Sequence, residues 1–305
     1  MIETLLSILF IYLFIILGYL AKAIYKDQVD SRTLTIMSVY FLQPFVTVWG
    51  FSTARLEIGH FYVSLVYLGI ILLILIPTMM FGKLFFRDAK ERAIFSVAGF
   101  VGNTGNIGIP LGIALLGVES VIYTTLINIA NVLVVYTIGV YVYSRGSFSI
   151  RGSLLNIVKI PIIPAAMAAI LMNLAHVEMT GEILEFLKMG AYAGIVLQLF
   201  LLGTFLETVR IRELHPYLML SVLGQKFVIV PFATAFILSL TTLPLFVQAV
   251  LFMEMMVPLA VANLNLSSLY DCRPKEVTTL ILLSTLLFIP MLFVLSTVLT
   301  TYYAL

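Results

Sequence analysis

Residues 102–112 read GNTGNIGIPLG, and residues 253–266 read MEMMVPLAVANLNL. Each stretch interrupts a long apolar segment with glycine, asparagine or proline. Proline removes a backbone donor and clashes with the preceding helical turn, and glycine lowers the cost of leaving helical geometry. Backbone groups freed inside a bilayer must face protein or a water-filled cavity, because lipid cannot hydrogen-bond them. The two stretches therefore predict two interrupted helices beside a cavity, the first broken near residues 105–110.

The chain around these stretches has the composition of a membrane protein. Of its 305 residues, 62% are hydrophobic and 10% are charged, and the mean hydropathy is +1.13. A spanning helix needs about 20 mainly apolar residues, and charge clusters divide the chain into ten such segments. The expected spans are residues 4–21, 34–53, 61–82, 92–116, 120–144, 154–175, 187–206, 216–240, 243–268 and 277–301. We expect an all-α polytopic membrane protein.

Basic residues are concentrated on one side of the predicted spans. The connections after spans one, three, five, seven and nine hold most of the lysines and arginines, among them Lys22, Arg87 and Arg273. The opposite connections hold Arg55 and, at a span edge, Lys188. By the positive-inside rule, the first group of connections is cytoplasmic. We therefore expect a multi-pass protein of the inner (plasma) membrane with both termini outside the cytoplasm.

The polar stretch SRGSFSIRGS at residues 144–153 divides the ten spans into five and five. An odd number of spans per half makes the second half enter the membrane upside down. The expected parts are a first inverted repeat at residues 1–145, a cytoplasmic linker at 146–153 and a second repeat at 154–305. The interrupted helix is fourth in each half, which is typical of a secondary transporter's binding site. Aligning Pro110 with Pro258 makes Asn106 and Glu254 equivalent.

Polar residues near the two interruptions suit a small anion. The N-termini of half-helices attract anions through their backbone N–H groups, and neutral amides bind a carboxylate without desolvating a second ion. The candidate substrate-binding residues are Asn103, Thr104, Asn106, Pro110, Pro258, Asn263 and Asn265. In the alternative interpretation, Gly108 and Gly112 serve close helix packing and Pro110 only kinks its helix.

Two ionisable residues lie deep inside apolar spans, Lys226 in span eight and Glu254 in span nine. A charge at the centre of a spanning helix costs roughly 2.5 to 3.5 kcal/mol on insertion scales, so such residues usually face the protein interior or water. One interpretation is a structural ion pair that ties the two spans together. The other is a functional site, in which Lys226 balances Glu254 or a bound anion and Glu254 takes a coupling proton or cation.

Other classes of function lack the residues that they need. The net charge of +2 excludes a basic nucleic-acid surface, and a single cysteine, Cys272, excludes an internal disulfide or a cysteine-built metal site. His60, His176 and His215 lie at separate span ends, and no metal-ligand motif occurs. We expect no enzyme, no metal and no organic cofactor. A receptor would carry a soluble output domain, and an intramembrane enzyme would carry a convergent nucleophile and base.

The longer stretch GNTGNIGIPLGIALLG at residues 102–117, preceded by ERAIF at residues 91–95, resembles the auxin efflux carrier family. Its core has the pattern N-x-G-x-x-G-x-P. Further similarity lies in Pro44, in KFVIVPF at residues 226–232 and in VPLAVANLNLSSLY at residues 257–270. Plant members of this family are the PIN proteins, and bacterial members include permeases for malonate and malate. The chain has no long hydrophilic loop between its halves, so it resembles a compact prokaryotic member.

The resemblance implies a fold like that of bile acid sodium symporters, in which helices four and nine cross at their prolines. Spans one, two, six and seven would form a scaffold and dimer surface, and spans three to five and eight to ten would form a transport domain. The carboxylate of an anionic substrate would lie beside the crossover asparagine, by position Asn103, with Asn106 and the Asn263 region nearby.

The expected function is therefore secondary transport of small organic anions, either mono- or dicarboxylates or auxin-like acids. The resemblance implies elevator-type alternating access by a homodimer in the lipid bilayer. A sodium- or proton-coupled carrier of another small solute is the main alternative. A membrane receptor and an intramembrane enzyme are the alternatives from other classes.

Overall fold

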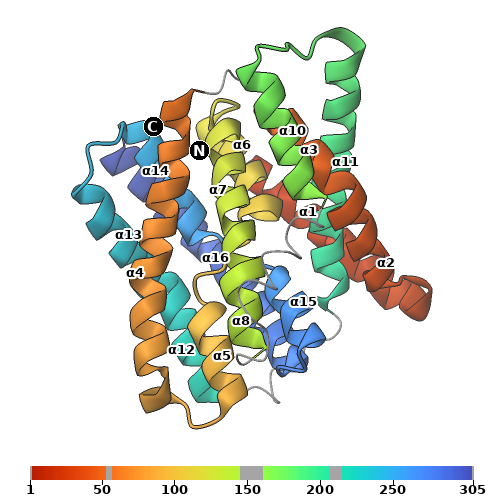
Figure 1. Ribbon diagram of the computed structural model, residues 1–305. Helices are drawn as coiled ribbons and strands as arrows, with labels where there is room; N and C mark the ends of the chain where they lie inside the picture. The colour runs from red at the N-terminus through yellow and green to blue at the C-terminus, as the bar shows by residue number, and fades with distance from the viewer. Residues whose placement is uncertain (1, 53–56, 145–160, 207–214, 304–305) are drawn as a thin grey trace. The chain divides into compact units, whose positions relative to one another are not determined.

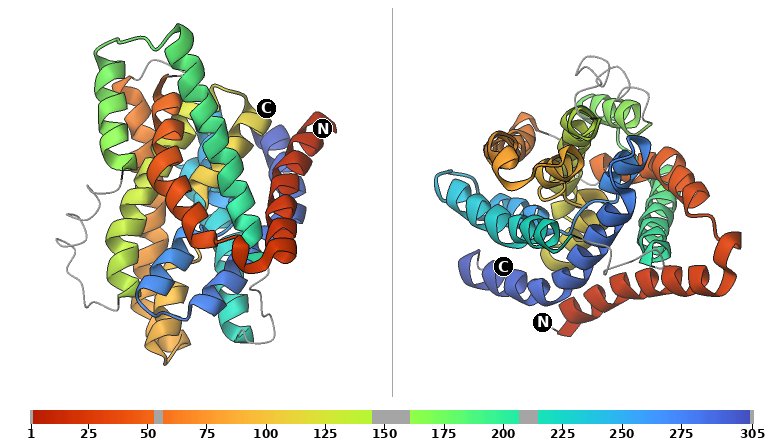
Figure 2. Two further views of the ribbon diagram at one scale, coloured as in Figure 1. Left: turned by 90° about the vertical axis from the view of Figure 1, so that its right-hand side faces the viewer. Right: turned by 90° about the horizontal axis from the view of Figure 1, so that it is seen from below.

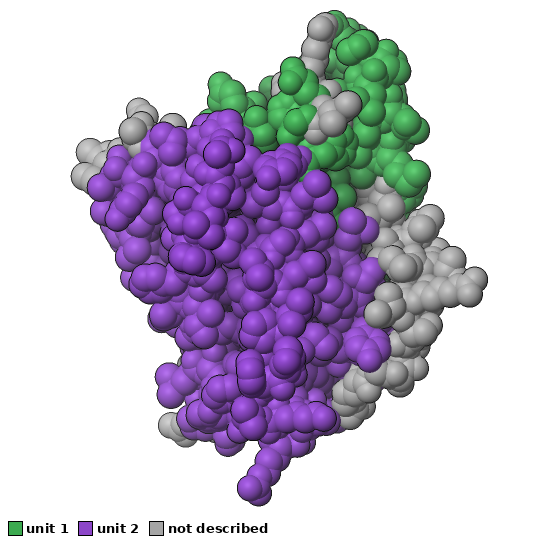
Figure 3. All heavy atoms as spheres, turned by 60° about the vertical axis from the view of Figure 1, so that its left-hand side comes forward, with its two compact units in different colours: residues 1–61, 105–129, 156–207 green, residues 62–104, 130–155, 208–305 purple. Residues whose placement is uncertain are grey.

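The computed structural model describes residues 2–52, 57–144, 161–206 and 215–303 (Figure 1). These residues are largely helical, and their strand-like pairing is limited to one isolated bridge. The chain forms two compact units (Figure 3). Unit 1 comprises residues 1–61, 105–129 and 156–207, and unit 2 comprises residues 62–104, 130–155 and 208–305.

Unit 1 is built around two long helices. Its elements are α1 (Ile2–Tyr25), α2 (Ser31–Ile36), the π-helix η2 (Met37–Leu42), α3 (Gln43–Ser52), α6 (Ile109–Leu116), α10 (Ile162–Leu174), α11 (Gly181–Thr204) and the first part of α7 (Ser120–Val134). Both α1 and α3 pack against α11, and α10 packs on α3 (Figure 2). A side chain at Gly18 would overlap the backbone carbonyl of Phe200, so α1 and α11 approach at their backbones.

Unit 2 contains the last part of α7 and a further set of helices. They are α4 (Phe61–Phe85), α5 (Ala89–Val97), the π-helix η5 (Val135–Gly139), α8 (Val140–Tyr143), α12 (Pro216–Gly224), the π-helix η8 (Gln225–Ile229), α13 (Val230–Ser239), α14 (Leu245–Met256), α15 (Ala262–Leu269) and α16 (Pro274–Tyr302). α16 packs against α12, α14 and α15, and α14 also packs against α13. The π-helix η4 (Thr104–Gly108) leads from unit 2 into unit 1.

Several helices have the length and composition of membrane spans. Within the described ranges, five stretches are long and apolar enough, namely Phe61–Phe85, Ser120–Tyr143, Gly181–Leu201, Pro216–Ser239 and Pro274–Tyr302. Large apolar side chains are exposed along α4, including Leu65, Met80 and Leu84, as on a surface that contacts lipid. The expectation of an all-helical polytopic membrane protein is confirmed at this level.

The finer topology stays a prediction. Each of the ten expected segments contains helical residues in its described part, but α10, α6 and α14 are shorter than a full span. The linker expected at residues 146–153 and the start of the second repeat lie outside the described residues. The inverted relation of the two halves and the side of the membrane on which the termini lie are likewise untested.

The first interruption lies earlier in the chain than the sequence predicted. α5 ends at Val97, residues 101–103 are extended, and residues 104–108 are π-helical, whereas the break was expected near residues 105–110. Pro110 lies in the first turn of α6. α6 follows η4 without a gap, so residues 104–116 form one helical stretch and Pro110 does not break it.

The alignment of the two prolines is corrected by the same observation. Pro258 lies within its interruption, between the end of α14 at Met256 and the start of α15 at Ala262. Pro110 lies after its interruption, so aligning the prolines does not superpose the two breaks. The equivalence of Asn106 with Glu254, which depends on that alignment, is therefore not supported, and neither is a crossing at both prolines.

Candidate functional site

Two short segments of unit 2, at the interruptions of their helices, cross and pair in antiparallel direction. We call residues 101–104 the first crossing segment and residues 257–261 the second. Gly102 and Leu259 form the isolated antiparallel bridge between them. On the other side of Leu259, its backbone N–H donates to Ser284 Oγ of α16 over 3.1 Å. The crossing is thus held both by its own backbone and by a side chain from a neighbouring helix.

Two backbone hydrogen bonds connect the crossing segments. Asn103 N donates to Pro258 O over 2.8 Å, and Ala260 N donates to Val101 O over 2.9 Å. Groups released from helical hydrogen bonding at membrane depth need such partners, since an unpaired group in hydrocarbon costs several kcal/mol. The pairing explains how both helices can be interrupted at the same place.

An asparagine of α7 fixes the first crossing segment. Asn131 donates from Nδ2 to Gly102 O over 2.9 Å and to Thr104 Oγ1 over 3.0 Å. Its own Oδ1 accepts a hydrogen bond from Tyr67 OH of α4 over 3.1 Å. Sequence analysis missed Asn131 and Tyr67. An asparagine in the apolar run NIANVLVVY is the signal that could have indicated a buried partner.

A second asparagine joins both crossing segments. Asn263 donates from Nδ2 to Val101 O over 3.3 Å and to Ala260 O over 3.1 Å, and its Oδ1 accepts from Tyr143 OH over 3.1 Å. Asn263 was predicted as a substrate-binding residue. In this conformation its amide is engaged with backbone carbonyls, so it supports the crossing.

Lys226 lies against the crossing from η8. It is fully buried, and its Nζ donates to Met255 O, in the last turn of α14, over 2.9 Å. A methyl group placed on Gly102 would lie 3.2 Å from Lys226 Nζ. The absence of a side chain at Gly102 therefore lets the ammonium group approach the first crossing segment closely.

The two buried charges do not form a hydrogen-bonded ion pair. Glu254 is 1% exposed, and neither of its carboxylate oxygens has a hydrogen-bond partner among the described residues. Glu254 and Lys226 interact electrostatically, while the Lys226 ammonium bonds to Met255 instead. Asn103 is 4% exposed and its Nδ2 also lacks a partner in the described part of the chain. The crossing and the neighbouring end of α14 thus hold an amide donor and a carboxylate that have no hydrogen-bond partner among the described residues.

The predicted site residues divide between the two units. Asn103, Thr104, Pro258 and Asn263 lie together at the crossing in unit 2, close to Lys226. Asn106 and Pro110, both half-buried, belong to unit 1, and the side chain of Asn265 lies outside the described residues. Within unit 2, the structure therefore brings together four of the seven predicted substrate-binding residues.

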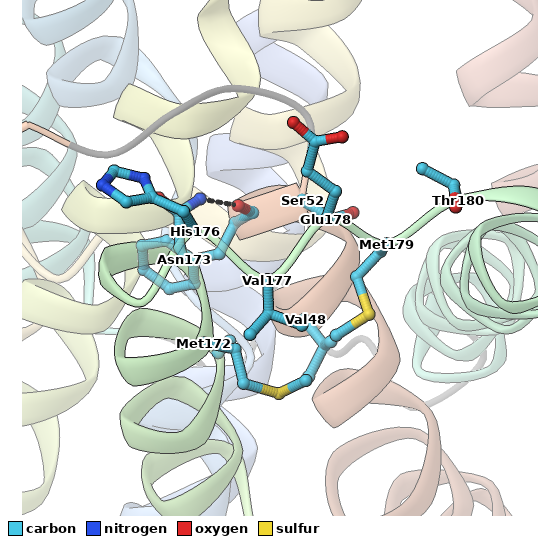
Figure 4. A pocket seen from close by; sticks show the side chains of 11 residues that line it. Val48, Ser52, Met172, Asn173, His176, Val177, Glu178, Met179 and Thr180 are labelled. Carbon is cyan, nitrogen blue, oxygen red and sulfur yellow. Dashed lines mark hydrogen bonds between the residues drawn. The ribbon is translucent and has the colours of Figure 1, made fainter.

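A pocket of about 360 Å³ lies in unit 1 and contains none of these residues (Figure 4). α3, α10 and the segment after α10 form it, and Asn173 at its edge donates to the backbone carbonyl of Phe51. The pocket is lined by Val48, Phe51, Ser52, Ala169, Met172, Asn173, His176, Val177, Glu178, Met179 and Thr180. Its lining has Glu178 but no lysine or arginine, so it does not suit an anion.

The described ranges were also searched for side chains that could form a metal site. No group of three His, Cys, Asp or Glu residues there could hold a metal ion. Cys272, whose connection was expected to be cytoplasmic, is buried and donates its thiol hydrogen to Lys90 O over 3.5 Å. The polar residues of the crossing are therefore the strongest candidate for a functional site.

Comparison with known proteins identifies a family of membrane transport proteins. Residues 4–152 match the family model described as a membrane transport protein, which is the domain of the auxin efflux carrier family. The matched residues include the first crossing segment. A comparison with curated proteins finds no match. The resemblance seen in the glycine- and asparagine-rich stretch is thereby confirmed, and residues 4–152 of this chain match the auxin efflux carrier family of membrane transport proteins.

Proposed function

We propose that this membrane transporter carries small organic anions, either mono- or dicarboxylates, and that the anion binds at the crossing in unit 2. The observation that carries the proposal is the buried Asn103 Nδ2, a donor without an acceptor among the described residues. Leaving such a group unpaired costs about 1 to 3 kcal/mol, and a carboxylate oxygen would supply its acceptor.

Lys226 supports the choice of an anion over a neutral solute. Its ammonium group lies beside Gly102, the residue before Asn103, and uses one of three N–H donors on Met255 O. A carboxylate between Asn103 and Lys226 would accept one hydrogen bond from the amide and would face a positive charge. Pairing of opposite charges reduces the cost of burying either one.

The division of the chain supports elevator-type alternating access. All the crossing residues that would contact the anion lie in unit 2, whereas α1, α3, α10 and α11 lie in unit 1, together with residues 105–129 of the predicted spans four and five. In our proposal, unit 2 carries the anion and unit 1 is the scaffold of a homodimer. α11 exposes Ile183, Phe186 and Met189, which are apolar enough to contact lipid or a second copy.

Thermal unfolding of the purified protein with malonate, malate, pyruvate and indole-3-acetate tests the proposed site. An anion at 100 times its dissociation constant adds about 2.7 kcal/mol of stability. Asn103→Ala should weaken binding about 10- to 150-fold, since it removes a hydrogen bond to a charged group worth about 1.5 to 3 kcal/mol.

The matched control is Asn131→Ala, which should lower stability without any anion because Asn131 holds the backbone. Asn103→Ala should leave the stability of the anion-free protein nearly unchanged, since its Nδ2 bonds to no described residue. Equal stabilisation of the Asn103→Ala variant and the unmodified protein by the same anion would move the site elsewhere.

A further inference from the structure

The two charges buried in unit 2 are held differently. Lys226 and Glu254 are 0% and 1% exposed. The ammonium group of Lys226 is fixed by a 2.9 Å hydrogen bond to Met255 O, whereas the carboxylate of Glu254 accepts no hydrogen bond from the described residues. A buried carboxylate without a donor is stabilised when it takes up a proton, because the neutral acid costs far less to bury. Glu254 therefore suits a group that gains and loses a proton.

The surroundings of Glu254 leave Lys226 as its charge partner. Lys226 and Tyr67 interact electrostatically with Glu254. Of the helices packed against α14, α13 has no titratable side chain, and α16 carries Lys275 and Glu276 in its first turn and Tyr302 at its end. In the described part of unit 2, the balance of charge near the crossing is therefore set by Lys226, Glu254 and any bound ion.

The summed charge of Lys226, Glu254 and a bound anion indicates which states of the transporter can change conformation. Without an anion, ionised Glu254 and protonated Lys226 sum to zero. A bound monovalent anion makes the sum negative, unless Glu254 takes up one proton and restores it to zero. An unbalanced charge at membrane depth is costly, so the neutral states are favoured during a conformational change. The anion and the proton then move together.

We propose that transport is coupled to protons, with Glu254 as the proton carrier and Lys226 as the fixed counter-charge, at one proton for each monovalent anion. An oxygen of the Glu254 carboxylate binds a proton from water on the side where the anion enters. The O–H bond breaks on the other side, where proton and anion are released. Net transport is electroneutral. This inference rests on the proposed function at the same crossing.

The position of Lys226 also favours a proton over sodium as the coupling ion. In secondary transporters, sodium is coordinated by unwound carbonyls and by the C-terminal ends of half-helices. Here the carbonyl of Met255, in the last turn of α14, already accepts a hydrogen bond from the ammonium of Lys226. A positive group fixed at this place repels a second cation.

Transport into proteoliposomes tests the coupling with labelled pyruvate as the probe. A proton gradient of one pH unit can support at most about tenfold accumulation of a monovalent anion by electroneutral symport. Glu254→Gln should abolish this accumulation and keep pyruvate exchange, because its loaded state is neutral and its empty state is not. The Lys226→Met variant should lose both accumulation and exchange, because its binding site carries a net negative charge when pyruvate is bound.

The matched control is the exposed pair Glu185 and Lys188, whose charged groups lie 3.8 Å apart in unit 1. Glu185→Gln with Lys188→Met should leave accumulation unchanged. The double variant Lys226→Met with Glu254→Gln should also fail, since its loaded state stays negative. Full accumulation by that double variant, or accumulation driven by sodium without a pH gradient, would overturn the proposal.

An infrared measurement tests Glu254 without any substrate. On acidification, the band of protonated carboxyl groups should grow more in the unmodified protein than in Glu254→Gln, because the variant lacks the buried carboxyl group. Identical difference spectra for the two proteins would overturn the inference. Failure of pyruvate and malonate exchange would instead count against the proposed function, while the infrared result still decides the role of Glu254.

Discussion

Both crossing segments must pair backbone groups that are freed where a helix is interrupted, but they contain different residues. The first, residues 101–104, contains Asn103 and Thr104, and an asparagine from α7 holds it. The second, residues 257–261, reads VPLAV and contributes only backbone polar groups. Side chains outside the segment that bond to its backbone are Ser284 of α16 and Asn263 of α15. Both segments pair backbone groups with each other, but only the first offers side-chain polar groups to a ligand.

This difference teaches that similar backbone geometry does not require similar chemistry. An interrupted helix in a membrane must pair its freed backbone groups, whatever its function. A small anion needs only one amide and one positive charge, so one segment can carry the amide while the other stays apolar. The charged groups come from neighbouring helical residues, Lys226 and Glu254. The predictions below test whether the supports of the two segments are also unequal.

Replacement of Asn131 by alanine should have the largest effect on stability. It would leave Gly102 O and the Tyr67 hydroxyl without partners, and each buried unsatisfied group costs about 1 to 3 kcal/mol. The midpoint of thermal unfolding without ligand should fall clearly. Tyr67→Phe, which keeps the bond from Asn131 to the backbone, should lower it less. Equal midpoints for Asn131→Ala and the unmodified protein would show that the first segment needs no such support.

Ser284→Ala should have a smaller effect, because it removes the support of one backbone group in the second segment. The N–H of Leu259 would lose its acceptor, at a cost of about 1 to 3 kcal/mol. The control is Ser239→Ala on the exposed end of α13, for which we expect less than about 0.5 kcal/mol. If Ser284→Ala destabilises more than Asn131→Ala does, the order of the two supports is reversed.

Lowering the pH should have the smallest effect on stability, through charged residues that flank the two segments. Asp88 caps α5, which leads into the first segment, and Arg273 follows α15 after the second. The pKa of Asp88 is lowered, chiefly by the hydrogen bond from Glu91 N and further by the charge of Arg273, 3.5 Å away. A carboxylate with a lowered pKa stabilises the fold above its unfolded pKa and loses that contribution as pH falls through the folded value.

Stability should therefore decline below about pH 4, the usual range of an aspartate. Asp88 is 45% exposed, so solvent screening keeps its share below about 1 kcal/mol. Thermal unfolding from pH 7 to pH 3 should show a smaller decline for Asp88→Asn than for the unmodified protein. Glu185→Gln, on an exposed helix of unit 1, should not change the decline. Parallel profiles for Asp88→Asn and the unmodified protein would exclude a role for this cap.

Sequence patterns predicted the helical segments well, because long apolar runs in this chain form helices at the expected places. They also located both interruptions, although the first lies before the residues expected. The glycines and Pro110 mark unusual backbone, but their order does not say whether a proline ends one helix or starts the next. That choice depends on what the freed backbone groups bind, and here Val101 and Asn103 find their partners in the other segment.

The order of residues was enough to predict a helical membrane protein with two interrupted helices, and to mark Asn103, Lys226 and Glu254 as unusual for their surroundings. Hydropathy and residue type are local, so one chain is enough to show them. The folded chain was needed to show that Lys226 bonds to Met255, that no described residue donates to Glu254, and that Asn131 and Asn263 hold the backbone. These partners are far apart in sequence, and a polar residue in an apolar helix does not specify which distant group it will meet.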